Sequence, residues 1–277
     1  MKILTKEWFN LDRASEFVLH PIADIHCGNR GCDEARLKQT VATIAENENH
    51  YWVGLGDYAE FINVKDRRFD AKELAKWVKI EYLSDLAYYQ RDRVCKILEP
   101  IAHKCLGLIK GNHEESIQRW SERDVYREIV GEIKRMGKFE AGHELAFGFS
   151  GWLRLKFYRS AKRNAASTIV ISLHHGFVGG KLAGAKALNM QRWLWNHEAD
   201  IAIFGHSHNA SVQWEGVDAL DRSGNLITRS RVGLFASTYL TRAYYAEVKG
   251  YFPLGMAKTR IVLRPHARHS QIEIISS

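Results

Sequence analysis

Four short segments combine histidine with aspartate or asparagine, or pair two histidines, and a fifth carries an aspartate after a glycine; all five follow runs of apolar residues. The last of them, His206-Ser207-His208, follows the run Ile201-Ala202-Ile203-Phe204-Gly205. Two imidazoles one residue apart at the end of a short strand can reach one ion if the turn curls around it, and imidazole suits Zn, Fe, Mn and Ni. A lone His-x-His is more often part of a surface loop, so the other four segments decide between the two interpretations.

The other four segments occupy the same kind of position. They are Asp24-Ile25-His26, Gly56-Asp57, Gly111-Asn112-His113-Glu114 and His174-His175-Gly176, each after an apolar run. Side chains two residues apart on a strand, as at Asp24 and His26, project in the same direction. One such pair is also compatible with a salt-bridged loop, but five strand ends of this kind indicate a shared site. The expected ligands are carboxylates, an amide oxygen and imidazoles, with no thiolate. This set favours a pair of divalent cations bridged by one carboxylate, and not a structural zinc site.

These polar groups must be positioned by buried strands. Residues 17–23 and 51–55 are typical of such strands, and the apolar stripe over 33–49 predicts a helix between them, which together form a parallel βαβ unit. Residues 104–110 and 168–173 have the same strand pattern. Because ligands gather at the carboxyl ends of parallel strands, we expect the polar groups to meet at one edge of a sheet.

The rest of the chain supplies helices and antiparallel strands. The spacing of apolar residues predicts a helical insertion near 70–103 and another helix over 115–137. After Gly142 the pattern changes to short alternating strands, and residues 210–277 contain a hairpin and a closing antiparallel pair. The sequence shows no repeat, low-complexity tract or Pro/Gly-rich linker, which predicts a single domain over 1–277.

The composition bounds the partners and the location. A formal net charge of +8 and a pI near 9.3 favour attraction of polyanions such as nucleic acid or nucleotides. The 4 cysteines show no Cys-x-x-Cys spacing and are interpreted as reduced thiols. No stretch resembles a signal peptide or approaches the roughly 20 apolar residues of a spanning helix. We therefore expect a cytoplasmic protein without a membrane partner, whose oligomeric state is unknown.

Taken together, the five segments resemble the motifs of the calcineurin-like metallophosphoesterase superfamily in order and approximate spacing, over residues 24–208. The glycine-rich segment after His174 is most similar to bacterial and bacteriophage members. The resemblance implies an α/β fold, a four-layer α/β/β/α sandwich of two mixed β-sheets flanked by helices. It also implies a metal-dependent phosphoric ester hydrolase with two divalent metal ions, with Mn as the first choice and Fe, Zn or Ni as alternatives.

The resemblance further assigns roles to the matching residues. The ligands implied for the first metal are Asp24, His26 and His208, those for the second are Asn112, His206 and either His174 or His175, and Asp57 bridges the two. His175 is preferred because it directly precedes a glycine. His113 would donate a proton to the leaving group instead of binding metal, so the expected catalytic residues are His113, Asp57 and Asp24. The implied reaction is metal-assisted phosphoester hydrolysis.

The sequence says less about the substrate. Basic and aromatic residues near the expected site would suit phosphate contacts and base stacking, but they could equally be solvated or part of the core. They are Arg30, Lys181, Lys186 and Arg192, with Trp193, Trp195, Tyr244, Tyr245 and Phe252. Our first hypothesis is a phosphodiesterase acting on DNA, RNA or a nucleotide. The alternatives are a phosphomonoesterase or pyrophosphohydrolase of a small metabolite, and an inactive scaffold protein that retains its metal.

Overall fold

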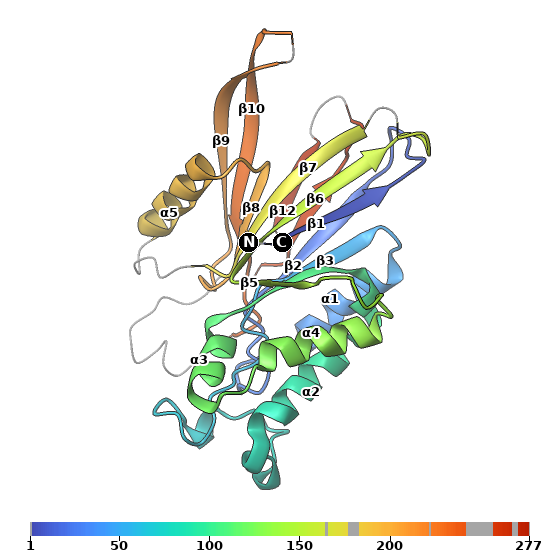
Figure 1. Cartoon of the computed structure of the whole chain (residues 1–277). Coiled ribbons are helices and arrows are strands. Elements are labelled where there is room, and N and C mark those ends of the chain that lie inside the picture. Colours follow the sequence, from blue (N-terminus) through green and yellow to red (C-terminus); the bar gives the residue numbers. More distant parts are fainter. Residues whose placement is uncertain are drawn as a thin grey trace.

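Two six-stranded β-sheets form the centre of the protein (Figure 1). The computed structural model describes residues 2–163, 166–176, 183–221, 223–241, 257–267 and 271–276. Within these ranges, no helix combines the length and the apolar character needed to cross a bilayer.

The first sheet contains the parallel strands expected around the βαβ unit. Its strands are β2 (Phe17–Ile22), β3 (His50–Gly54), β4 (Cys105–Ile109), β5 (Ala146–Gly148), β11 (Thr259–Leu263) and β12 (Ile272–Ser276), in the spatial order β12-β11-β2-β3-β4-β5. Strands β2, β3, β4 and β5 run parallel, and β11 pairs antiparallel with both β2 and β12. The carboxyl ends of β2, β3 and β4 therefore lie at the same edge.

The second sheet carries the two histidine-bearing strand ends. Its strands are β1 (Lys2–Trp8), β6 (Ser150–Tyr158), β7 (Ala166–His174), β8 (Ile201–Phe204), β9 (Ser211–Leu220) and β10 (Leu226–Phe235), in the order β1-β6-β7-β8-β10-β9. Strands β7 and β8 are parallel neighbours, so their carboxyl ends also share an edge. The β9–β10 hairpin is antiparallel and extends beyond the rest of the sheet (Figure 1).

Helices cover the outer faces of both sheets. Helices α1 (Glu34–Glu46), α2 (Leu86–Leu98), α3 (Asn112–Ser121) and α4 (Val125–Met136) lie on the side of the first sheet, and α5 (Ala183–Asn196) lies on the second (Figure 1). Apolar side chains fill three cores: Leu37 and Trp52 under the first helices, Leu19 and Ile203 between the sheets, and Met190 under α5. Three cores separate four layers, which confirms the α/β/β/α sandwich.

The segment expected to be helical over 70–103 forms an α-helix only from Leu86 onward. Before α2 there are two 3-10 helices, η1 (Ala71–Glu73) and η2 (Ile80–Asp85), and after it comes a third, η3 (Glu99–Lys104). Between η1 and η2, the Ala75 N–H donates to the Gly28 carbonyl at 2.9 Å, and Leu74 pairs with Asn29. Backbone groups that a helix would pair internally are thus bonded to the loop after β2.

The helix expected over 115–137 is also divided, into α3 and α4. Glu122 adopts a left-handed backbone conformation with φ of 54°, which ends α3, and the Asp124 side chain accepts the Arg127 N–H and starts α4. The division lets α3 begin at Asn112, directly at the end of β4, while α4 packs on the sheet.

Candidate metal centre

The polar segments at the five strand ends converge at one edge of the two sheets. The segments follow β2 (Asp24, His26), β3 (Asp57), β4 (Asn112, His113), β7 (His175) and β8 (His206, His208). Three of these strands belong to the first sheet and two to the second. The site is therefore assembled across the interface between the sheets.

Five of these positions have a backbone conformation that is uncommon outside glycine. φ is 48° at Asp24, 50° at His26, 51° at Asp57, 63° at His206 and 57° at His208. A left-handed conformation costs a residue with a Cβ about 1–3 kcal/mol and persists only where the surroundings impose it. Such strain concentrates at functional sites, and here it occurs at the ends of three strands, β2, β3 and β8.

Two glycines allow the ends of β3 and β4 to touch. A Cβ on Gly56, whose φ is 90°, would lie 2.6 Å from the Gly111 Cα, and a Cβ on Gly111 would lie 2.2 Å from Asp57 Oδ1. Both distances are far shorter than van der Waals contact, so only glycine fits at either position. The Gly-Asp and Gly-Asn-His segments therefore need their glycines for close approach, not for chain flexibility.

A first group of ligand atoms comes from Asp24, His26, Asp57 and His208, whose donor atoms all lie within 4.8 Å of one another. The Nε2 atoms of His26 and His208 are 3.3 Å apart, and His208 Nε2 lies 3.5 Å from Asp24 Oδ1. Asp24, His26 and Asp57 are buried. The group has the size and the mixed oxygen and nitrogen chemistry of a site for one divalent cation.

A second group comes from Asp57, His175 and His206, again within 4.8 Å of one another. His175 Nε2 lies 2.9 Å from Asn112 Oδ1 and 3.5 Å from Asp57 Oδ2. His206 Nδ1 is buried and has no hydrogen-bond partner among the described residues. Asp57 belongs to both groups, which is the position that a bridging carboxylate would occupy.

The structure places His175, and not His174, in this site. The His174 ring lies on the other side of the sheet, with its centroid 4.9 Å from that of Trp193, and its Nδ1 accepts the Gly176 N–H at 2.8 Å. Because side chains alternate across a strand, the last residue of β7 and the residue after it point to opposite faces. His174 is therefore not in either donor group.

Burial shifts the pKa values of Asp24, His206 and His208 when no cation is bound. It raises the pKa of Asp24 to about 7, and the neighbouring Asp57 carboxylate adds to the rise. It lowers the pKa of His206 to about 4 and that of His208 well below its usual value. Both imidazoles are thus neutral at neutral pH, the state in which a ring nitrogen can coordinate a metal.

Glu60 is a residue of this site that the sequence reasoning missed. Its Oε2 lies 3.1 Å from His26 Nδ1, and although burial opposes protonation, this carboxylate raises the pKa of His26 to about 9. The contact leaves His26 Nε2 for the first donor group, an arrangement in which a carboxylate orients a metal-binding imidazole. In the sequence, the signal for Glu60 is that it lies three residues after Asp57.

Glu114 holds the backbone of the centre together. Its carboxylate accepts the N–H groups of Asp57 at 2.9 Å, Tyr58 at 2.8 Å and Gly111 at 2.8 Å, and its side chain is fully buried. The sequence reasoning named Glu114 within the Gly-Asn-His-Glu segment but gave it no role. The structure shows that it ties the end of β3 to the start of α3.

His113 lies beside the first donor group. Its backbone N–H donates to Asp57 Oδ1 at 3.0 Å, and its ring meets the His26 ring edge-on with centroids 4.7 Å apart. Its Nδ1 bonds to the Glu60 carbonyl oxygen, so this nitrogen carries the proton. The expected role as a proton donor stays a prediction, since His113 also forms a group of close donor atoms with His26 and Glu60.

The sequence of the chain matches the family model of the calcineurin-like phosphoesterases over residues 21–210. The chain belongs to the calcineurin-like phosphoesterase family. It is therefore a metal-dependent phosphoester hydrolase, and both donor groups lie within the matched range. No curated protein sequence matches the chain.

Solved structures of similar proteins have low sequence identity to this calcineurin-like phosphoesterase. A predicted phosphoesterase of Streptococcus pneumoniae TIGR4 is 12% identical, with a TM-score of 0.37 over 95% of this chain and 99% of that one. The calcineurin-like phosphoesterase YfkN of Bacillus subtilis is 12% identical, with a TM-score of 0.38 over 95% and 90%. Vps29 of Entamoeba histolytica, complexed with Zn²⁺, is 10% identical, with a TM-score of 0.39 over 94% and 98%. These scores are low, so the family assignment rests on the sequence match.

The donor set fits the divalent metal on which the phosphoesterase family depends. The carboxylate and imidazole donor atoms of each group lie within 4.8 Å of one another. His206 Nδ1 has no hydrogen-bond partner among the described residues. A cation would satisfy these lone pairs at once, whereas an apolar or hydrogen-bonded core would not arrange them in this way. The four cysteines are free thiols and contribute to neither group.

The residues expected to contact substrate are only partly placed at the site. Lys186 on α5 donates to the Ser207 carbonyl at 3.1 Å, between His206 and His208, whereas Arg192 is exposed about 9 Å further along the helix axis. Arg30 is exposed, and its Nη1 donates to the Lys72 carbonyl at 3.3 Å.

The aromatic residues expected near substrate divide into core and surface. Trp193, on α5, is partly buried and packs against the core beneath this helix, and its Nε1 donates to Ser172 Oγ at 3.1 Å. Trp195 is 65% exposed. The expected contacts at Lys181, Tyr244, Tyr245 and Phe252 lie outside the described residues.

Proposed function

We propose that this phosphoesterase binds two divalent cations and hydrolyses phosphodiester bonds of nucleic acid or nucleotides. The observation that supports two ions is the membership of Asp57 in both donor groups. The residues that would hold the first ion are Asp24, His26, Asp57 and His208, and those for the second are Asp57, Asn112, His175 and His206. Bound divalent cations lower the pKa of water and neutralise the charge that develops on a phosphoester.

The protein's own side chains supply the remaining parts of the reaction. His113 would donate a proton to the departing alkoxide, a contribution of about two to four powers of ten in rate. Glu60 keeps the His26 ring in place, and Glu114 keeps the Asp57 and Gly111 backbones together. Because these groups are oriented before substrate binds, the site needs less reorganisation during the reaction.

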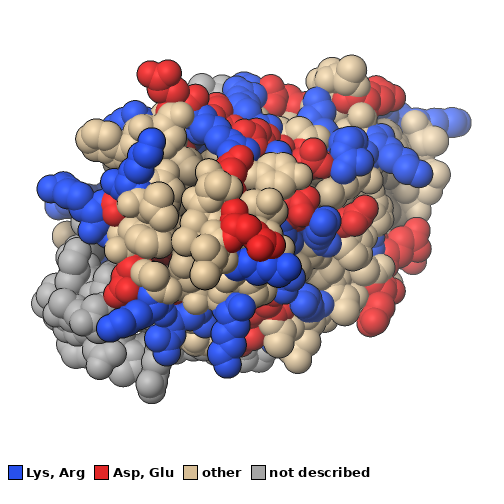
Figure 2. All heavy atoms as spheres, turned by 90° about the horizontal axis from the view of Figure 1, so that it is seen from below, with Lys and Arg blue, Asp and Glu red and all other residues tan. Residues whose placement is uncertain are grey.

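The preference for a polyanionic diester is supported by charge and by the surroundings of the site. The chain carries a net charge of +8, Lys186 is bonded to the loop between His206 and His208, and Arg30 follows His26 on an exposed turn. Figure 2 shows acidic and basic side chains interspersed over the face seen from below, so that face offers no patch of one sign.

A substrate panel on protein of measured metal content tests the proposal. Bis(nitrophenyl) phosphate should be hydrolysed faster than nitrophenyl phosphate or a pyrophosphate, and binding of single-stranded DNA or RNA should weaken steeply with salt. A preference for the monoester or the pyrophosphate would replace the diesterase proposal with that of a small-metabolite enzyme. Absence of turnover with Mn, Fe, Zn or Ni bound would favour a scaffold.

The number of metal ions is tested by two single variants. Because His206 and His208 lie in different donor groups, His206→Ala and His208→Ala should each remove about half of the bound metal, and the double variant nearly all of it. Metal content is measured by elemental analysis after removal of excess ion. An unchanged metal content in either single variant would contradict the assignment of that histidine.

A further inference from the structure

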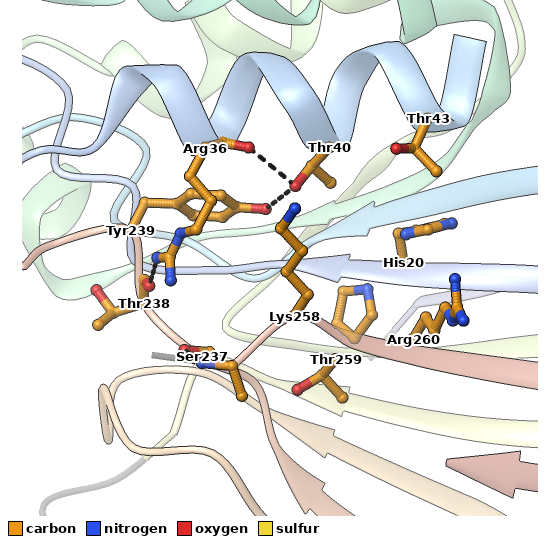
Figure 3. Close-up of a pocket in the computed structure, with 12 residues that line it drawn as sticks. His20, Arg36, Thr40, Thr43, Ser237, Thr238, Tyr239, Lys258, Thr259 and Arg260 are labelled. Atoms are coloured by element: carbon orange, nitrogen blue, oxygen red, sulfur yellow. Dashed lines mark hydrogen bonds between the residues drawn. The ribbon is translucent and has the colours of Figure 1, made fainter. Parts of the chain in front are cut away.

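A second polar pocket lies outside the candidate metal centre. Its volume is about 270 Å³, and it lies between α1, the start of β11 and residues 237–239 (Figure 3). His20 and Pro21 of β2 also line it. None of the residues that line it belongs to either metal donor group. The proposed hydrolysis does not use it.

The charged groups that line this pocket are all cationic. Arg36 projects from α1, and Lys258 and Arg260 come from the opposite wall (Figure 3). No aspartate or glutamate lines the pocket, and none of the three cations forms an ion pair within the part of the chain that the structure describes. A pocket with several unpaired cations attracts an anion.

Arg36 distinguishes this pocket from an ordinary basic surface. The residue is only 9% exposed, its guanidinium lies 4.8 Å from the Tyr239 ring centroid, and its Nη2 donates to the Thr238 carbonyl. Its Nε and Nη1 atoms are buried and have no hydrogen-bond partner among the described residues. A buried guanidinium with unpaired N–H groups is costly unless an anion supplies acceptors.

Hydroxyl groups complete the lining. Thr40 and Thr43 of α1 face Thr259 of β11 across the pocket (Figure 3). The Thr40 and Thr43 hydroxyls already donate to the Arg36 and Gln39 carbonyls, at 3.1 and 2.9 Å, so among the described residues Thr259 is the threonine of this lining whose proton is free for an anion. Thr259 Oγ1 is buried and lacks a partner among the described residues, like the two Arg36 nitrogens. Hydroxyls beside a guanidinium are typical contacts of phosphate oxygens, which accept several hydrogen bonds at once.

We propose that this pocket binds a phosphate group, either as inorganic phosphate or as the phosphate of a small metabolite. Cations without carboxylates select an anion, and the mixture of guanidinium, ammonium and hydroxyl donors matches phosphate oxygens. The volume of about 270 Å³ suits a phosphate with a few further atoms and excludes a nucleic-acid strand. The proposal is independent of the reaction at the metal centre.

Calorimetric titration of the whole chain tests this site. Inorganic phosphate and glycerol 3-phosphate are titrated into an Asp57→Asn background, which disables the metal centre as a competing phosphate site. We expect phosphate binding to persist in this background. Arg36→Met, which keeps the apolar stem, should weaken it about tenfold or more, since a hydrogen bond to a charged group contributes at least that factor.

Two further variants keep the result interpretable. Lys258→Met/Arg260→Met changes only exposed side chains and should also weaken phosphate binding, even if Arg36→Met does not fold. Arg135→Met, at an exposed arginine paired with Glu132 on α4, is the matched control and should leave affinity unchanged. Tighter binding of glycerol 3-phosphate than of inorganic phosphate would show that the ligand is the phosphate group of a small metabolite. Tighter binding of inorganic phosphate would show that the ligand is the free ion.

The proposal is overturned by either of two results. The first is that neither anion binds the Asp57→Asn protein. The second is that both anions bind, but with affinities that the Lys258→Met/Arg260→Met variant shares with the Arg135→Met control.

Discussion

Asp57 faces both donor groups through one oxygen of its carboxylate. Its Oδ2 lies 3.5 Å from His175 Nε2 and 4.0 Å from His26 Nε2, while its Oδ1 accepts the His113 backbone N–H at 3.0 Å. One oxygen thus faces both groups while the other is fixed by the start of α3. The direction of the carboxylate is therefore set by the backbone of the neighbouring strand end.

His113 provides the sharpest test at the scale of single residues. His113→Ala should keep the metal content of the wild type while lowering kcat by about two to four powers of ten, because only a proton donor is lost. The loss should be greatest for substrates whose leaving groups have a high pKa and need the proton most. Loss of metal in this variant would show that His113 is a ligand instead.

At the scale of elements, the centre depends on how closely the ends of β3 and β4 approach. Gly56 and Gly111 are in contact, and Glu114 bonds to the backbones of both ends. The strand ends are therefore one rigid unit that sets the position of Asp57 before any ligand binds.

Replacement of one of these glycines should disturb the metal centre directly. Gly111→Ala places a Cβ 2.2 Å from Asp57 Oδ1, so the carboxylate must move, and bound metal and activity should both fall. The matched control is Gly131→Ala in the exposed interior of α4, where a Cβ meets nothing within 4 Å. That control should raise stability by about 0.5–1 kcal/mol and keep full activity. Normal metal binding by Gly111→Ala would contradict this account of the two strand ends.

Strand β2 also carries a buried histidine that makes stability depend on pH. Burial, with the nearby His50 and Arg260, lowers the pKa of His20 to about 3. The unfolded chain, with a pKa near 6.5 at this residue, binds more protons below that pH, so the contribution of His20 to stability is present above about pH 6.5 and is lost as pH falls toward 3.

His20→Gln removes this titration and should make the loss of stability in acid smaller. When the pH is lowered from 7 to 5, the unfolding free energy of the variant should fall by about 1–2 kcal/mol less than that of the wild type. The measurement is urea unfolding of chelator-treated protein in buffers without phosphate, which avoids changes in ligand occupancy. Parallel pH profiles for the two proteins would exclude the assignment to His20.

At the scale of the whole molecule, the metal centre and the phosphate pocket both lie where separate layers meet. Candidate ligands from both sheets lie together at the centre, so bound ions would join the two sheets at one edge. The pocket shares a wall with the centre, because Thr238 Oγ1 and the Tyr239 N–H both donate to the Asp24 carbonyl, at 2.8 and 3.0 Å. Arg36 also donates to the Thr238 carbonyl, so one segment is hydrogen-bonded both to the proposed phosphate site and to a proposed metal ligand.

Removal of metal should consequently lower the stability of the whole protein. Ions at about 1,000 times their dissociation constant would stabilise the fold by about 4 kcal/mol. For a chain of this size, their removal corresponds to a fall in Tm of roughly 10 °C. Calorimetric scans before and after treatment with a chelator measure the difference, and added Mn should restore it. The double variant His206→Ala/His208→Ala should show little response, and an equal response would mean that the chelator acts elsewhere.

The sequence by itself determined the chemistry of the candidate site and much of the layer architecture. Apolar runs followed by Asp24 and His26, or by His206 and His208, locate strand ends because burial and alternation are local properties of the chain. The same local signals misjudged residues 70–85, where backbone groups bond to the loop after β2 in place of forming a helix.

Only the tertiary structure decided which residues meet. It placed His175 rather than His174 among the donors, added Glu60 behind His26, and brought Arg36 opposite Lys258 around a pocket that no local motif indicates. The physical reason is that the packing of the two sheets and their helices decides two things. It decides which way a side chain at a strand end points, and which distant segments come into contact. Residue type and spacing specify what a site can bind, and packing specifies which atoms form it.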